Sequence, residues 1–173
     1  MLQTGARIFL MPQRPYVPLG TLRRATTYPS SPDEIEDDVV RTALEKVGLG
    51  HFVARLDEDS HWENTLSGGE KQRLAFARLL ILRPDIVIMD EATSALDPSS
   101  QEHLMNRVID QLPEATVISV GHRPELEKFH DRKISLVYHP DGARLVRDEN
   151  LAWPRRPSAR MLSRLLDRDR DVA

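Results

Sequence analysis

Two adjacent carboxylates, Asp90 and Glu91, directly follow the apolar run Ile86–Met89. A continuous apolar run of this length is typical of a strand that is covered on both faces in a parallel sheet. Ligands of open α/β sheets bind at the carboxyl edge of the strands, so we expect both side chains at such an edge. Asp90 is suited to Mg²⁺, which prefers oxygen ligands, and Glu91 to polarising a water for attack on phosphorus. A solvated strand end is the simpler alternative for this pair taken alone.

A second group of residues is expected where a helix begins: Ser67, Gly68, Gly69 and Glu70. The serine and the glutamate have the spacing of a capping box, and helix-favouring residues continue to Arg83, before Pro84. The first backbone N–H groups of a helix lack partners, and glycines let an anion approach them closely. These four residues therefore fit a phosphate site, and they fit an ordinary capped helix start equally well.

Single polar residues follow two further predicted strands. His122 comes shortly after Thr116–Val120, and Gln13 comes shortly after Ile8–Met11. Both runs are predicted to be buried strands, so both polar residues are expected at the edge that holds Asp90 and Glu91. The histidine could share that cleft, and the glutamine amide could reach a metal or a water. A structural role is the alternative for each, and no role is assigned to the other histidines: His51, His61, His103, His130 and His139.

The elements that must position these residues alternate between strands and helices, which predicts an α/β fold with a mainly parallel sheet. Prolines between Pro12 and Pro18 predict a loop that continues to Gly20. Pro140-Asp141-Gly142 predicts a β-hairpin that joins Lys133–Tyr138 to Ala143–Val146. Helices are expected over four ranges: 31–48, 67–83, 99–112 and 124–129.

Composition excludes several classes of protein. The chain has 173 residues, no cysteine, and 24 Lys and Arg against 27 Asp and Glu, a net charge of −3. A disulfide scaffold and a thiolate metal site are therefore excluded, and the bulk charge argues against a strongly basic nucleic-acid binder. Apolar runs are far shorter than the roughly 20 residues of a membrane span. We expect one domain over residues 1–150 and an arginine-rich tail over 151–173.

Taken in order, these motifs resemble the nucleotide-binding (ATPase) domain of ATP-binding cassette (ABC) transporters. The resemblance covers about residues 6–147. Met11–Pro15 is similar to the Q-loop, Leu66–Arg73 to the signature motif, and Ile86–Glu91 to Walker B with its catalytic glutamate. Ser94–Asp97 is similar to the D-loop, and His122 to the switch histidine. Pro15–Arg23 and the hairpin near Pro140 are most similar to bacterial and peroxisomal half-transporters with a fused membrane domain.

The resemblance implies a set of roles. Glu91, His122 and Gln13 would be catalytic, and Asp90 and Gln13 would hold Mg²⁺. The signature residues would contact the ATP of a partner: Ser67, Gly68, Gly69 and Glu70. Asp97 would lie in the D-loop at a dimer contact. The cofactors would be ATP and Mg²⁺, and the partners an ABC transmembrane domain and a second nucleotide-binding domain, without nucleic acid. The location would be the cytoplasmic face of a membrane.

One motif of this family is missing from the sequence. No Gly-x-x-x-x-Gly-Lys-Ser/Thr loop, which would hold the β- and γ-phosphates, occurs in the 173 residues. We therefore expect an incomplete P-loop fold from the C-terminal part of a larger protein, inactive alone, with apolar sheet surface exposed. A non-catalytic regulatory or remnant fragment is the alternative. A soluble ABC-type ATPase of DNA repair is disfavoured, because no sustained heptads separate Gln13 from Ser67.

Overall fold

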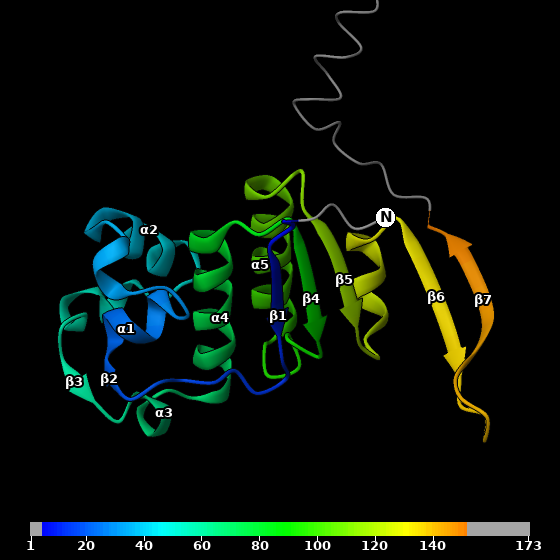
Figure 1. The fold of residues 1–173 in the computed structure, drawn as a ribbon, viewed down its shortest axis with the longest axis horizontal. Helices are drawn as coiled ribbons and strands as arrows, with labels where there is room; N and C mark the ends of the chain where they lie inside the picture. The colour runs from blue at the N-terminus through cyan, green and yellow to red at the C-terminus, as the bar shows by residue number, and fades with distance from the viewer. Residues whose placement is uncertain (1–4, 152–173) are drawn as a thin grey trace, which may run out of the picture. The chain divides into compact units, whose positions relative to one another are not determined.

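The computed structural model describes residues 5–151, which form two compact units, residues 5–122 and 123–151. The first unit contains a three-stranded parallel sheet with the strand order β1-β4-β5 (Figure 1). The strands are β1 (Ile8–Met11), β4 (Ile86–Asp90) and β5 (Thr116–Val120). Leu10 pairs with Ile88, which pairs with Ile118. Because the strands are parallel, their carboxyl ends meet at one edge, as the sequence predicts.

The two faces of this sheet differ in burial. Side chains alternate along a strand, and on one face Met11, Val87 and Met89 are buried. On the other face Ile8, Leu10, Ile118 and Val120 are 49–59% exposed. The prediction that residues 8–11 and 116–120 form buried strands is therefore wrong for this second face, although the bounds of both strands are confirmed. The expected exposure of apolar sheet surface is present in the described part of the chain.

The helices of the first unit pack around α4 (Gly68–Leu82). This helix contacts α1 (Leu22–Thr27), α2 (Asp37–Lys46) and α5 (Pro98–Gln111). In Figure 1, α4 lies between the sheet and the part formed by α1 and α2. The remaining elements are short: the antiparallel strands β2 (Gly20–Thr21) and β3 (Asp59–Ser60), the 3₁₀ turns η1 (Pro32–Glu34) and η2 (Gly50–Arg55), and α3 (Trp62–Thr65).

Both ends of α4 lie where the sequence predicts them. Ser67 accepts a hydrogen bond from the backbone of Glu70, and the Glu70 carboxylate accepts one from the Ser67 N–H at 2.8 Å. The helix ends at Arg83, which is left-handed with φ +46°, immediately before Pro84. The capping box and the proline thus fix the length of the helix and the place of its N-terminus.

Two local predictions are corrected by the structure. The helix expected to begin at Ser31 begins at Asp37, because Ile35 is extended and separates it from the turn over 32–34. The loop expected to continue to Gly20 ends one residue earlier, at Leu19, because β2 begins at Gly20 and leads into α1. Thr21 caps α1 by accepting a hydrogen bond from the Arg24 N–H at 3.2 Å. A six-residue helix is too short to show a clear apolar period.

The second unit contains the 3₁₀ turn η3 (Pro124–Phe129) and the antiparallel strands β6 (Arg132–Val137) and β7 (Arg144–Asn150). The predicted hairpin is confirmed: β6 lies one residue earlier than expected, and β7 continues to Asn150 instead of ending at Val146. Arg132 and Asp148 form a salt bridge of 2.6 Å across it. None of the helices over residues 5–151 has the length and hydropathy needed to cross a bilayer. Most of the predicted tail, from residue 152 onward, lies outside the described residues.

Candidate functional site

Four polar residues lie at or just after the carboxyl ends of β1, β4 and β5, and we call them the strand-end cluster: Gln13, Asp90, Glu91 and His122. The Gln13 Nε2 donates to Glu91 Oε2 at 2.7 Å. The His122 Nε2 lies 3.7 Å from Glu91 Oε1. Each of the two carboxylate oxygens therefore faces a side chain that follows a different neighbouring strand. The predicted meeting of Gln13, Glu91 and His122 at one edge is what the structure shows.

The backbone of Glu91 has an unusual conformation. Its φ is +46°, in the left-handed region that side chains other than glycine seldom adopt. Its N–H donates to the Val120 carbonyl at 2.9 Å, and its own carbonyl accepts from the Ser94 N–H at 2.9 Å. Such conformations persist where the surrounding structure holds them and are frequent at functional sites. The chain therefore turns sharply after β4 at the residue whose carboxylate lies between Gln13 and His122.

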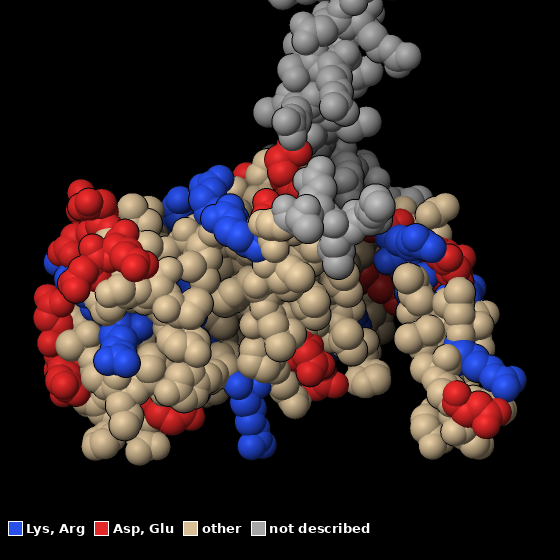
Figure 2. Space-filling view, viewed as in Figure 1, with Lys and Arg blue, Asp and Glu red and all other residues tan. Residues whose placement is uncertain are grey.

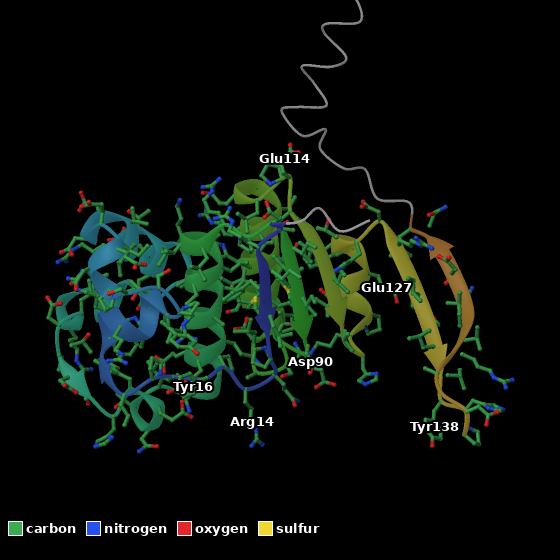
Figure 3. The ribbon with its side chains drawn as sticks, viewed as in Figure 1. Arg14, Tyr16, Asp90, Glu114, Glu127 and Tyr138 are labelled. Atoms are coloured by element: carbon green, nitrogen blue, oxygen red, sulfur yellow. The ribbon has the colours of Figure 1, made fainter. Side chains whose placement is uncertain are left out.

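Asp90 ends β4 and is exposed. Figure 3 shows it at the arrowhead end of the strand, and shows Arg14, the neighbour of Gln13, at the same edge. Over residues 5–151 no group of three His, Asp or Glu side chains is arranged to hold a metal by itself. One carboxylate and one amide nonetheless fit Mg²⁺, which keeps several waters and takes its remaining ligands from phosphates.

A second group, the helix-start cluster, lies at the N-terminus of α4 and consists of Ser67, Gly68, Gly69 and Glu70. A cavity of about 250 Å³ opens beside it. The residues that line this cavity come from three segments of the first unit, 48–51, 67–73 and 95–97: Gly48, His51, Ser67, Gly69, Glu70, Arg73, Ala95, Leu96 and Asp97. The structure therefore brings the signature-like residues and the D-loop-like residues to one cavity.

The charge of Glu70 is stabilised within this cluster. Burial raises the pKa of its carboxyl, but hydrogen bonds from the Ser67 hydroxyl (2.7 Å) and N–H (2.8 Å) and the nearby His51 outweigh burial, so the pKa is lowered. The His51 Nε2 lies 3.6 Å from Glu70 Oε1. A negative charge in the first turn also interacts favourably with the helix dipole. Sequence reasoning gave His51 no role, and its contact with Glu70 is new.

Gly69 lies at a close approach between α4 and the segment after β4. A Cβ atom at this position would lie 3.2 Å from the carbonyl oxygen of Ala95. Asp97, two residues after Ala95, caps α5 by accepting a hydrogen bond from the Ser100 N–H at 2.9 Å. Hydrogen bonds from the Ser100 hydroxyl and N–H lower the pKa of Asp97. In this chain Asp97 thus has a capping role as well as a place on the cavity wall.

Sequence reasoning missed one residue that joins the two clusters, Gln72. Its side chain is 1% exposed and contacts both the segment around Gln13 and the segment around Ala95. The available signal was a glutamine one turn into a helix whose next residues are almost all apolar. Its partners are far away in the sequence, so the pattern alone could not name them.

Comparison with known proteins identifies the family. The family model described as ABC transporter matches residues 3–94, more than half of the chain. The chain belongs to the ABC transporter family. The resemblance of the motifs to an ABC transporter ATP-binding domain is therefore confirmed, and the strand-end cluster lies in the first unit of this domain's fold.

Individual relatives agree with this assignment. An ABC transporter ATP-binding protein of Haemophilus influenzae is 41% identical over 127 residues, which cover 73% of this chain and 21% of the relative. The human lysosomal cobalamin transporter is 43% identical over 139 residues, with 75% and 23% covered. ABC transporter D family member 2 of Arabidopsis thaliana is 38% identical, with 75% and 22% covered. The chain spans about a fifth of the length of these curated relatives.

A solved structure confirms the fold. A bacterial Atm1-family ABC exporter with ATP bound superimposes with a TM-score of 0.70 at 27% sequence identity. The superposition covers 94% of this chain and 26% of the exporter chain. The α/β fold with a parallel sheet, a helical part around the signature motif and a C-terminal hairpin is therefore confirmed.

Proposed function

We propose that this sequence works as part of the ATP-binding and ATP-hydrolysing subunit of an ABC transporter, where it powers transmembrane transport. The observation that carries the proposal is the contact of Glu91 with both Gln13 and His122. These three residues follow three adjacent parallel strands, at the edge where such sheets bind ligands. Family membership supports the same conclusion.

Each residue of the strand-end cluster has a task in hydrolysis. Glu91 accepts the proton of the attacking water as its oxygen approaches the γ-phosphorus. Gln13 holds one carboxylate oxygen of Glu91 at 2.7 Å and so orients the base. His122, 92% exposed at its side chain, extends into solvent beside Glu91 and faces the γ-phosphate. Asp90 and Gln13 would hold Mg²⁺, which neutralises the charge that develops on the phosphate oxygens.

The helix-start cluster serves a different nucleotide. Ser67, Gly68 and Gly69 present a hydroxyl and the first N–H groups of a 15-residue helix, which favour an anion. We propose that Ser67–Glu70 contact the ATP of a second nucleotide-binding domain, in a homo- or heterodimer, and that Asp97 lies at the same dimer contact. Residues 1–150 act as the ATP-binding domain, 151–173 as a tail, and a membrane domain holds the pair at the cytoplasmic face of a membrane.

Nucleic acid is not a proposed partner. Acidic side chains gather over the part formed by α1 and α2 (Figure 2), and the sequence there contains Asp33, Glu34, Glu36, Asp37 and Asp38. An acidic surface repels a phosphate backbone, and the whole 173-residue chain has a net charge of −3.

The β- and γ-phosphates need a further element. None of the 173 residues forms a Gly-x-x-x-x-Gly-Lys-Ser/Thr loop, whose N–H groups and lysine cradle them. We therefore propose that this loop is supplied by residues outside the sequence, and that residues 1–173 alone do not hydrolyse ATP. Below, "full transporter" means this sequence together with such a loop and a membrane domain.

Glu91→Gln in the full transporter tests the proposed function. The amide keeps the size of the side chain but cannot accept the proton, so hydrolysis is expected to slow by roughly 10²–10⁴-fold while ATP still binds. Glu114→Gln is the matched control, because Glu114 lies at the opposite edge of the first unit from Asp90 (Figure 3). Hydrolysis within twofold of the parent in Glu91→Gln would show that Glu91 is not the base.

A further inference from the structure

The side chain of Gln72 uses every polar atom it has. Its Oε1 accepts from the Ala95 N–H at 2.9 Å, and its Nε2 donates to the Gln13 carbonyl at 3.3 Å and to the Ser94 Oγ at 3.2 Å. The side chain is 1% exposed, so water cannot replace these partners. A buried amide left without its hydrogen bonds is destabilising, so the side chain is held in this one arrangement.

The partners of Gln72 belong to both clusters of the site. Gln13, whose carbonyl is held, donates its side-chain amide to Glu91 at 2.7 Å. Ala95, whose N–H is held, lies against Gly69 at the start of α4 and two residues before Asp97. Gln72 itself lies in the second turn of α4, five residues after Ser67. One side chain thus connects α4, which carries the signature residues, to the backbone of Gln13 and to the segment that follows Glu91.

We propose that Gln72 is a positioning residue, which holds the backbone of Gln13 so that the Gln13 amide stays directed at Glu91. Gln72 touches neither nucleotide nor water and acts on hydrolysis through Gln13. Its Oε1 holds the Ala95 N–H and thereby keeps Asp97, on the wall of the cavity, in place beside the start of α4. This inference rests on the proposed function, because it assigns Gln72 a task in the hydrolysis that Glu91 carries out.

A double-mutant cycle in the full transporter tests the proposal. Gln72→Met keeps the side-chain volume but removes the hydrogen bonds, and is expected to lower kcat by about 10- to 100-fold, the range that a misplaced catalytic group produces. The affinity for ATP should stay at the parent value. In a Gln13→Ala background the same change should cost little more, because the amide that Gln72 positions is already gone.

Gln111→Met is the matched control. It removes a glutamine that accepts a hydrogen bond from Lys46 at 3.0 Å, at the end of α5. Its effect on kcat should be small and equal in both backgrounds. If Gln72→Met slows hydrolysis equally in both backgrounds, it acts through general packing and the proposal is overturned. A parent-like kcat in Gln72→Met overturns it as well.

Gln72→Glu separates the contact with Gln13 from the contact with Ala95, and it tests the proposal if Gln72→Met does not fold. A carboxylate still accepts from the Ala95 N–H, and the Ser94 hydroxyl can turn to donate to it, but it cannot donate to the Gln13 carbonyl. Hydrogen exchange at the Ala95 amide should therefore stay at the parent rate in Gln72→Glu, while kcat falls. A parent-like kcat in this variant would overturn the proposal.

Failure of this inference and failure of the proposed function give different results. If the function is wrong, Glu91→Gln hydrolyses ATP at the parent rate, whatever Gln72 does. If only the inference is wrong, Glu91→Gln hydrolyses ATP slowly. In that case Gln72→Glu keeps a parent-like kcat, or Gln72→Met slows hydrolysis equally in both backgrounds.

Discussion

At the scale of single residues, the site depends on Glu91. Its left-handed backbone, held by the Val120 carbonyl, places a carboxylate between two side chains from neighbouring strand ends. Gln13 contacts one oxygen and His122 lies near the other. These contacts orient the Glu91 carboxylate before any substrate arrives, which suits the general base that we propose it to be.

Asp90→Asn should behave differently from Glu91→Gln in the full transporter. Asp90 is the proposed Mg²⁺ ligand, and a neutral amide is a weaker ligand for a hard cation than a carboxylate. We expect the Mg²⁺ concentration that gives half-maximal hydrolysis to rise at least about tenfold, the effect of losing roughly 1.4 kcal/mol of binding. Titration of the hydrolysis rate with Mg²⁺ measures this. An unchanged midpoint would remove Asp90 from the metal site.

Some of these residues could be predicted from the sequence and others could not. Glu91, Gln13 and His122 each follow an apolar run, and parallel strands necessarily bring such positions to one edge. The roles of Gln72 and His51 depend on contacts with segments many residues away. A local pattern carries no information about such contacts, so these two residues emerged only from the structure.

At the scale of elements, the start of α4 controls the helix-start cluster. Hydrogen bonds from Ser67 and the nearby His51 lower the pKa of Glu70 below its ordinary value. A carboxyl whose pKa is lowered by folding stabilises the folded state above its unfolded pKa and loses this contribution as pH falls through the folded pKa. The capping box is therefore expected to weaken in acid.

Glu70→Gln tests this acid dependence. At pH 7 the variant should be less stable than the parent, and the difference in unfolding free energy should shrink as the pH falls below about 4.5, the ordinary range of a glutamate carboxyl. Urea unfolding of the parent and the variant at several pH values measures the difference. A difference that stays constant from neutral to acid pH would show that the Glu70 charge does not stabilise the helix start.

Elements with strong end signals were predictable, and those without were not. The capping box and Pro84 fixed both ends of α4, and the apolar runs located β1, β4 and β5. Ser31 has an equally good capping pattern, yet its segment forms one 3₁₀ turn. The sequence also predicts more burial than the strands have. Apolar side chains show that a strand can be covered on both faces, but whether it is covered depends on elements elsewhere in the chain.

At the scale of the whole molecule, residues 1–173 should bind Mg-ATP weakly by themselves. The chain has the residues that we propose activate water and hold Mg²⁺, but no Gly-x-x-x-x-Gly-Lys-Ser/Thr loop to hold the β- and γ-phosphates. We expect isothermal titration to give no dissociation constant in the low micromolar range, about −8 kcal/mol. Binding of that strength would show that the phosphates are held by residues of this chain that we have not assigned.

The exposed face of the sheet leads to a second expectation for residues 1–173 alone. Ile8, Leu10, Ile118 and Val120 give a contiguous apolar surface, and such surfaces favour association. Sedimentation should show a mass that rises with concentration. A monomer at all concentrations would mean that residues outside the described range cover this face.

The central claim is that one chain activates water on its own ATP and contacts the ATP of its partner, and mixed dimers of the full transporter test it most directly. Ser67→Arg blocks the signature contact with the partner's nucleotide, and Glu91→Gln removes the base for the chain's own nucleotide. A dimer with one Ser67→Arg chain and one Glu91→Gln chain carries both changes at a single site and should keep hydrolysing at the other site. A dimer with both changes on one chain beside an unchanged chain has one change at each site and should lose hydrolysis. The opposite order of the two rates would contradict the account.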